Sequence, residues 1–224
     1  MAKLSRYLTR IRENKVRPYI KGKVLDLGCG EAKAINYKAV TRYFGVDLDH
    51  KCKELTKKYP SGEFLSKNLE NDEINLLEKV DLVLMSAFIE HIKNYDNPIR
   101  QSINNLKSGG SIVITTPTKF GNFIHFCGEI FGLFPKSVRN SHKIILSKSD
   151  FIEIGQKYNL KLKKYKKFEL FCNHLVIFEK WKKLALTLSI LRMDGYWYWT
   201  YVNLQVETSK RKVLSILLNK KKED

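Results

Sequence analysis

A short segment near the start of the chain carries the residues with the clearest chemical meaning. Residues 24–30 read Val-Leu-Asp-Leu-Gly-Cys-Gly, an apolar run that ends in an acid and two glycines. Because glycine has no Cβ, Gly28 and Gly30 allow a tight strand-to-helix turn in which a ligand lies against bare backbone and a helix N-terminus. The segment therefore predicts a nucleotide-type cofactor site, followed by a helix over residues 32–40.

The residues around these glycines distinguish between cofactors. In the dinucleotide fingerprint Gly-x-Gly-x-x-Gly, a third glycine lets the helix pack closely below a pyrophosphate, and here Lys33 occupies that position. Asp26 lies two residues before the first glycine, where it would repel a pyrophosphate but is suited to an ammonium group. The run from Asp26 to Gly30, with Cys29 between the glycines, resembles the Asp/Glu-x-Gly-x-Gly motif of the class I S-adenosylmethionine-dependent methyltransferases. The resemblance implies that the turn and the acid bind the methionine end of S-adenosylmethionine.

Two further segments follow in the order of this family. Residues 43–47 read as a second strand ending in Asp47, about 20 residues after the first motif, the spacing at which a carboxylate meets ribose hydroxyls. Residues 63–68 read as a third strand ending in Asn68, where the family usually has Asp to accept from the adenine amino group. The amide oxygen of Asn68 can still accept a hydrogen bond. The resemblance adds Leu48 and Leu69, next to these two residues, to the cofactor contacts.

The fourth matching segment combines a strand with a short polar motif. Residues 80–86 form an apolar run ending in Ser86, and residues 87–92 read Ala-Phe-Ile-Glu-His-Ile. The pair is similar to the fourth strand and the Leu-Glu-His-Ile segment of the small-molecule branch of the family. The resemblance places Ser86 at the cofactor and His91 where the substrate pocket opens.

The order of apolar runs predicts the fold class. Strands and helices alternate, which is typical of a parallel sheet covered by helices on both faces. With residues 111–117 as the fifth strand, we expect a Rossmann-like, doubly wound, seven-stranded α/β sheet. It is mostly parallel with an antiparallel last strand, and it has insertions after strands five and six. The expected helices cover residues 5–14, 32–40, 51–58, 96–106 and 148–158; a sixth strand covers 160–170, a helical insertion 173–192 and a seventh strand 196–207.

Length and cysteine content indicate one methyltransferase domain over residues 1–224. We divide it into a basic N-terminal arm (1–23), a cofactor-binding core (24–118), an aromatic lid or insertion (119–147) and a substrate-side half (148–224). The four cysteines lack the spacing of a zinc site and are expected to be free thiols in a reducing compartment. No metal site is predicted, and the expected location is the cytoplasm, since no apolar run follows the basic N-terminus.

The net charge of +18 is unevenly distributed. Residues 1–23 carry +7, residues 24–118 carry −1 and residues 119–224 carry +12. The excess therefore lies in the segments expected to form the substrate side. It indicates an anionic partner such as a phosphate-bearing substrate, an anionic membrane surface or nucleic acid; the bland alternative is a lysine-rich solvated surface.

Residues 120–135 form an unusual insertion, with five phenylalanines and several glycines between basic flanks. Such a segment suits a lid over an apolar acceptor such as a lipid tail, or a helix lying in a bilayer interface. The alternative is a buried segment that covers the sheet or a dimer contact. We favour the lid or core interpretations and keep peripheral contact with an anionic membrane open.

Histidines are the candidates for removing a proton from an acceptor hydroxyl, because the reference pKa of histidine is about 6.5. His142 lies in the segment Ser-His-Lys-Ile-Ile-Leu-Ser, which resembles the approach to the fifth helix in several sugar and quinone O-methyltransferases. His91 and His125 are the alternatives. Any of the three is equally consistent with a structural role in the scaffold.

These features predict S-adenosylmethionine-dependent methyl transfer to a hydroxyl of a small or lipid-linked acceptor, of saccharide or isoprenoid type. The Asn/Asp-Pro-Pro-Tyr motif of exocyclic-amine base methyltransferases is absent after the fourth strand, where residues 86–89 read Ser-Ala-Phe-Ile. An RNA methyltransferase remains an alternative, because the basic flanks and the aromatic residues 196–199 could contact and stack on bases. A catalytically inactive cofactor-binding module is the other alternative.

Overall fold

In the computed structural model, residues 3–130, 142–181, 190–193 and 196–199 are described. The chain divides into two compact units, residues 1–181 and 182–224. In the second unit, β8 (Ile190–Met193) pairs with β9 (Tyr196–Trp199) in a two-stranded antiparallel sheet. Among the described residues, no helix is long and apolar enough to cross a membrane.

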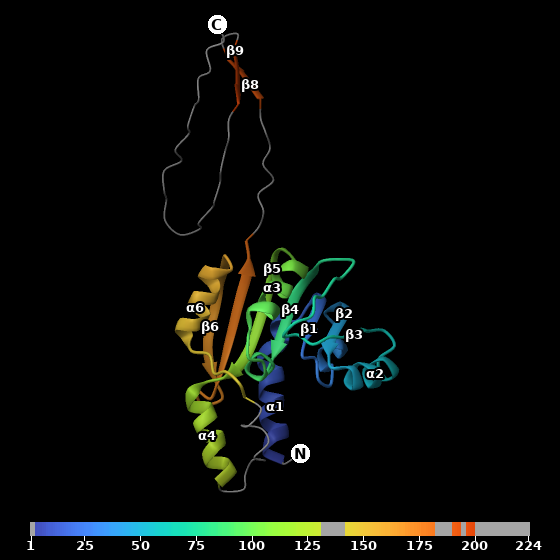
Figure 1. Cartoon of the computed structure of the whole chain (residues 1–224), viewed down its shortest axis with the longest axis vertical. Coiled ribbons are helices and arrows are strands. Elements are labelled where there is room, and N and C mark those ends of the chain that lie inside the picture. Colours follow the sequence, from blue (N-terminus) through green and yellow to red (C-terminus); the bar gives the residue numbers. More distant parts are fainter. Residues whose placement is uncertain (1–2, 131–141, 182–189, 194–195, 200–224) are drawn as a thin grey trace. The chain divides into compact units, whose positions relative to one another are not determined.

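The first unit is built on a seven-stranded sheet in the order β3-β2-β1-β4-β5-β7-β6 (Figure 1). β7 is antiparallel to both of its neighbours, whereas the pairs from β3 to β5 are parallel. This confirms the predicted Rossmann-like fold class. The strands are β1 (Gly22–Leu27), β2 (Val40–Asp47), β3 (Glu63–Ser66), β4 (Val80–Ser86), β5 (Leu106–Pro117), β6 (Leu160–Phe168) and β7 (Asn173–Lys180).

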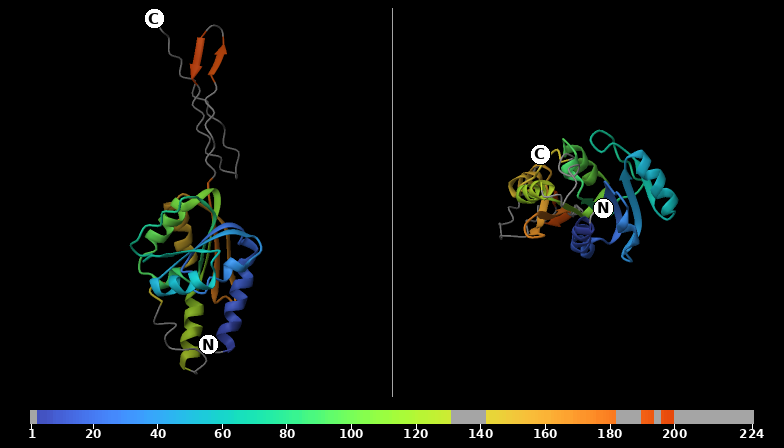
Figure 2. Two further views of the ribbon diagram at one scale, coloured as in Figure 1. Left: turned by 90° about the vertical axis from the view of Figure 1, so that its right-hand side faces the viewer. Right: turned by 90° about the horizontal axis from the view of Figure 1, so that it is seen from below.

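Helices cover both faces of this sheet (Figure 2), with α1 in blue on one side and α3 in green on the other. Successive strand residues point to opposite faces. Leu25 of β1 accordingly packs in a core with helix residues Ile99 and Phe151, and Val24 packs in a second core with Val16 of α1. The helices are α1 (Lys3–Val16), η1 (Arg17–Tyr19), η2 (Lys33–Asn36), α2 (Asp49–Lys58), η3 (Ile89–His91), α3 (Asp96–Asn105), α4 (Lys119–Ile130) and α6 (Lys148–Lys157).

The helix predicted over residues 32–40 is wrong. Only η2, a single 3-10 turn, follows the glycines, and β2 already begins at Val40. Ala32 takes the left-handed conformation with φ 53°, which an α-helix does not accommodate. Val40 pairs with Gly22 at the start of β1, so the chain has to return to the bottom of the sheet over these residues.

The elements predicted after strand six are also corrected. Residues 173–180 form β7, so the antiparallel seventh strand lies there instead of at 196–207, and the predicted helical insertion is not present at its start. β6 and β7 are joined by only four residues, of which Glu169, Leu170 and Phe171 have positive φ. The error arose because the apolar run of β7 reads equally well as a buried helix. Residues 200–207 lie outside the described part of the chain.

Helix α4 begins at a defined cap next to the β6–β7 turn. The hydroxyl of Thr118 accepts a hydrogen bond from the Gly121 N–H (2.8 Å) and donates one to the carbonyl of Phe171 (2.8 Å). This side chain therefore satisfies one of the unpaired N–H groups of the helix start. Gly121 packs so closely on the turn that a Cβ there would meet the carbonyl oxygen of Cys172 at 2.0 Å.

Candidate functional site

A cavity of about 790 Å³ opens at the carboxyl ends of β1 and β4. It is lined by the glycine turn, by Leu84, Ser86 and Ala87 at and just after the end of β4, and by one side of α1. Its volume lies in the range typical of small-molecule and cofactor sites, roughly 300–1,000 Å³. Of the residues predicted to bind the cofactor, the cavity brings together Asp26, Gly28, Cys29, Gly30 and Ser86.

The glycine turn has the backbone geometry expected from its sequence. Gly28 and Gly30 have φ values of +68° and +54°, which residues with a side chain rarely adopt. A Cβ at Gly30 would meet no atom closer than 4.0 Å, whereas one at Gly28 would lie 2.3 Å from the ring of Phe88. Gly30 therefore leaves open space in the turn, and Gly28 is required by the close packing of Phe88.

Asp26 is a buried acid on the floor of the cavity, with 5% of its surface exposed. The hydroxyl of Tyr43 donates a hydrogen bond of 2.7 Å to its Oδ2 atom. Burial raises the pKa of Asp26 to about 7, the Tyr43 hydrogen bond opposes this, and the charge of Asp47 adds to it. A cation that enters the cavity would lower the pKa of Asp26 again, because an opposite charge favours the ionised carboxylate.

Asp47 at the end of β2 is tied to the glycine turn. Its Oδ2 atom accepts from the Gly30 N–H and its Oδ1 atom from the Leu48 N–H, both at 2.8 Å. Because a carboxylate has about four lone-pair positions, both oxygens can still accept from a ligand hydroxyl. The side chain thus fixes the shape of the turn as well as presenting a charge beside it.

The remaining predicted cofactor residues lie outside the cavity lining. Leu48 is exposed (56%), and Leu69 is buried in the core. The Asn68 side-chain oxygen accepts from the Glu70 N–H at 3.1 Å, so it closes a local turn. Ser86, which does line the cavity, pairs its hydroxyl with that of Thr115 at 3.2 Å.

Sequence reasoning missed the contribution of α1 to this cavity. The arm 1–23 was assigned to the substrate side, yet Arg12, Arg17 and other residues of α1 and η1 line the cavity together with the glycine turn. The Arg17 guanidinium stacks over the Tyr37 ring at 4.8 Å, and Lys33 bridges to Glu13 of α1 at 2.8 Å. The available signal was Lys33 at the third glycine position, whose charge is paired with Glu13 of α1.

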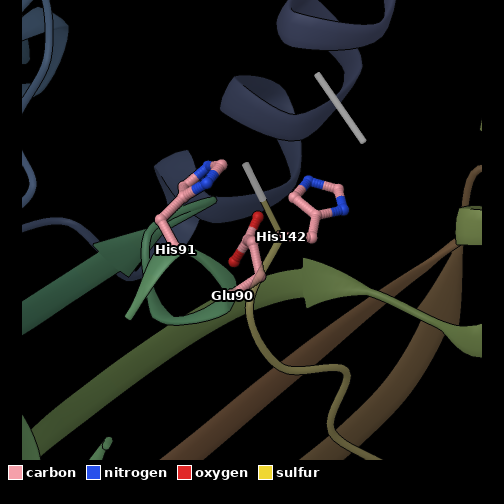
Figure 3. A group of neighbouring side chains, drawn as sticks. All are labelled: Glu90, His91 and His142. Carbon is pink, nitrogen blue, oxygen red and sulfur yellow. The ribbon is translucent and has the colours of Figure 1, made fainter. Parts of the chain in front are cut away.

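A second group of side chains lies next to the cavity, beyond Ala87. The rings of His91 and His142 have centroids 5.3 Å apart, and Glu90 lies beside them (Figure 3). The N–H groups of Lys143 and Ile144 donate to the Glu90 carbonyl at 2.7 and 3.3 Å. These bonds explain how two segments fifty residues apart come together.

The environment of His142 keeps its ring neutral. The ring is half-buried, and burial together with the charges of His91, His125 and Arg12 lowers the pKa of His142 to about 4. Its Nδ1 atom lies 3.1 Å from the Asn122 side-chain oxygen. Because an amide oxygen only accepts, Nδ1 carries the proton and Nε2 keeps its lone pair.

Together, the fold and the glycine-turn site define a class I S-adenosylmethionine-dependent methyltransferase. Residues 1–164 match the family model described as "Methyltransferase domain", and the chain belongs to this family. A search of curated proteins found no match.

Solved structures share the fold. An S-adenosylmethionine-dependent methyltransferase from Mesorhizobium loti superimposes with a TM-score of 0.59 at 14% identity, over 75% of this chain and 98% of that one. An O-methyltransferase family protein from Burkholderia thailandensis gives 0.59 at 14% identity, over 81% of this chain and 57% of that one. The YcgJ protein from Bacillus subtilis gives 0.58 at 11% identity, over 77% and 99%. At these identities the likeness concerns the fold alone.

The residues of the cavity fit S-adenosylmethionine. The cofactor carries an ammonium group, ribose hydroxyls and a carboxylate, and the cavity and its rim offer Asp26, Asp47 and the arginines of α1 and η1 as partners of matching charge. The open space at Gly30 leaves room for a ligand against the turn.

We expect the affinity for S-adenosylmethionine to depend on pH through Asp26. The pKa of Asp26 near 7 means that the carboxyl becomes protonated as the pH falls below 7, whereas an α-ammonium group stays charged there. The affinity should therefore fall by up to about tenfold per pH unit below pH 7. Calorimetry between pH 5.5 and 7.5 measures this; the Asp26→Asn variant should bind weakly and without this dependence, and a pH-independent wild type would contradict the assignment.

We expect Asp47→Ala to weaken S-adenosylmethionine binding by about 2 kcal/mol or more, which is roughly thirtyfold. The substitution removes the ribose partner and leaves the Gly30 N–H without its acceptor. The matched control is Asp49→Ala, because Asp49 is an exposed acid two residues further on, at the start of α2, and it pairs with Lys53. Calorimetry that shows the same affinity for Asp47→Ala and Asp49→Ala would refute the role of Asp47.

Proposed function

We propose that this methyltransferase acts on a hydroxyl of a small or lipid-linked acceptor, of saccharide or isoprenoid type. The observation that carries the proposal is the pair His91 and His142 beside the cofactor cavity, 5.3 Å apart between ring centroids. A hydroxyl must lose its proton to become a good nucleophile, and neutral imidazole is the usual group that assists. Both histidines were predicted from the sequence as candidates for this role.

Each part of the site has a task in this reaction. S-adenosylmethionine supplies an electrophilic methyl group, so alignment of the acceptor accounts for much of the catalysis. Asp26, Asp47 and the glycine turn hold the cofactor in the cavity. His91 and His142 receive the acceptor hydroxyl and promote loss of its proton. Arg12 of α1 and Arg17 of η1 line the cavity and offer positive charge to the cofactor carboxylate.

The exposed face of α4 supports a lipid-linked acceptor. Surface helices normally turn apolar residues inward and polar residues outward. In α4 the polar residues Asn122, His125 and Glu129 are half-buried or buried, whereas Phe123 and Ile130 are 57% and 65% exposed. The adjoining β6–β7 turn adds Leu170 and Phe171, exposed by 86% and 66%. An outward apolar surface of this kind suits contact with acyl or isoprenoid chains at a membrane interface.

The direct test is to incubate the protein with methyl-labelled S-adenosylmethionine and a cell extract divided into aqueous and lipid fractions. Mass spectrometry should find the label on an oxygen of a lipid-fraction or saccharide compound. Label on RNA instead would support the nucleic-acid alternative. Cofactor binding without label on any fraction would support the inactive module.

Once an acceptor is known, His142→Ala should lower turnover by roughly two to four decades, the usual size of a general acid–base contribution. The affinity for S-adenosylmethionine should stay unchanged, because His142 is not among the residues that line the cavity. His50→Ala is the control, since His50 is an exposed histidine on α2. Single-turnover rates and cofactor titrations separate the two effects, and a near-normal rate would remove His142 from the reaction.

We expect the protein to co-sediment with anionic vesicles, and less so at high salt. Each basic contact contributes about 1 kcal/mol and is screened within a Debye length. Phe123→Ser and Phe171→Ser should weaken binding at all salt concentrations, because buried apolar area is not screened. Lys53→Ser on α2 is the control for a surface change elsewhere. A protein that ignores vesicles and binds RNA with a steep salt dependence would contradict the membrane contact.

A further inference from the structure

Glu90, His91 and His142 form a group whose donor atoms lie close enough together to bind a metal ion. Each residue offers one donor atom, and these three atoms all lie within 4.8 Å of one another. Figure 3 shows the three side chains converging from η3 and from the segment that precedes α6. Two imidazoles and one carboxylate are a ligand set that divalent transition metals favour.

The carboxyl group of Glu90 gives independent support for a bound cation, because one of its buried oxygen atoms lacks a hydrogen-bond partner. Only 2% of Glu90 is exposed, and among the described residues its Oε2 atom has no hydrogen-bond partner. A buried, unpaired carboxylate oxygen is costly, so such groups are normally paired or coordinate a metal. His91, Thr116 and Arg12 are the neighbouring side chains that influence the pKa of this carboxyl. None of them is a hydrogen-bond partner of its Oε2 atom.

His142 is held in the orientation that a ligand requires. Its Nδ1–H donates to Asn122 of α4, which leaves the lone pair of Nε2 available. A metal-binding histidine typically donates its other N–H to such a partner, which fixes the tautomer and the ring. The backbone bonds from Lys143 and Ile144 to the Glu90 carbonyl hold the two ligand segments together.

We propose that Glu90, His91 and His142 bind one divalent transition-metal ion. Donors in adjacent positions on such an ion are about 3 Å apart, so side-chain rotation must draw the donor atoms together by less than about 2 Å from the observed limit of 4.8 Å. No metal site was predicted from residue spacing, because His142 lies far along the chain from the other two ligands. Two nitrogen ligands make Zn²⁺ and Fe²⁺ better candidates than Mg²⁺, and Mn²⁺ serves as the paramagnetic probe in the test.

The ion also specifies the acceptor, and this part rests on the proposed function. Three protein ligands leave positions for two oxygen atoms of one substrate, which selects an acceptor with adjacent hydroxyls or a hydroxyl beside a carbonyl. The bound hydroxyl has a lowered pKa and releases its proton to solvent, so with the ion bound His91 and His142 act through the ion and not as bases. The hydroxyl oxygen then forms a bond to the methyl carbon as the methyl–sulfur bond of S-adenosylmethionine breaks, and S-adenosylhomocysteine leaves. The ion is neither oxidised nor reduced.

The test is titration of the full-length, metal-free protein with Mn²⁺ alone, followed by calorimetry and by electron paramagnetic resonance. We expect one site, weakened at least about 100-fold in His142→Ala and in Glu90→Gln, and about 10- to 100-fold in Asn122→Ala, which removes only the orienting partner. His50→Ala should bind like wild type. Circular dichroism and an S-adenosylmethionine titration confirm that each variant is folded. If Glu90→Gln does not fold, the metal affinities of His142→Ala and Asn122→Ala decide whether the metal site is correct.

Absence of Mn²⁺ and Zn²⁺ binding to wild type, or equal binding by wild type and His142→Ala, would overturn the metal site. Methyl transfer that is unchanged by a chelator would overturn the role of the ion in the reaction. If Mn²⁺ binds at this site and S-adenosylmethionine binds in the cavity, yet no hydroxyl compound is methylated, the metal site is supported and the proposed function fails.

Discussion

Two carboxyl groups, Asp26 and Glu90, are buried at the carboxyl edge of the sheet, and much of the site follows from how each is compensated. Burying an ionised carboxylate without a partner costs several kcal/mol, so such a group either finds donors or takes up a proton. Asp26 has the Tyr43 hydroxyl and an open cavity on its other side. Glu90 has an oxygen with no hydrogen-bond partner in the described part of the chain, and two imidazoles lie nearby. The first arrangement suits an ammonium group, and the second suits a cation with several ligands.

Helix α1 forms one side of the cavity at this sheet edge. The connection after the glycine turn contains only η2, so that part of the sheet face is covered by α1 instead. The ion pair of Lys33 with Glu13 is partly exposed and contributes little to stability by itself. The ion pair instead connects α1 to the segment that follows the glycine turn. Arg12 then links the two parts of the site, because it lines the cofactor cavity and acts on Glu90.

The sequence predicted those parts of the molecule that depend on local pattern. Parallel strands such as β1 and β4 are almost wholly apolar because both faces are buried, so their ends, and with them Asp26 and Ser86, could be located. β7 was mistaken for a helix because its apolar run has no periodicity that distinguishes the two. The pairing of His91 with His142 depends on backbone bonds to the Glu90 carbonyl, and the position of Asn122 depends on packing of α4 against the β6–β7 turn. Such long-range contacts leave no trace in residue spacing.

Helix α4 connects the interior of the site with the outer surface. Asn122 orients His142 from the inner face of α4, and Phe123, the next residue, is on the outer face. The close contact of Gly121 with Cys172 fixes this helix to the β6–β7 turn, whose exposed Leu170 and Phe171 extend the apolar surface. The apolar surface and the His142 ring are therefore connected through a single helix, α4. Under the proposed function, an apolar chain bound to this surface would contact the residue of α4 next to the one that orients His142.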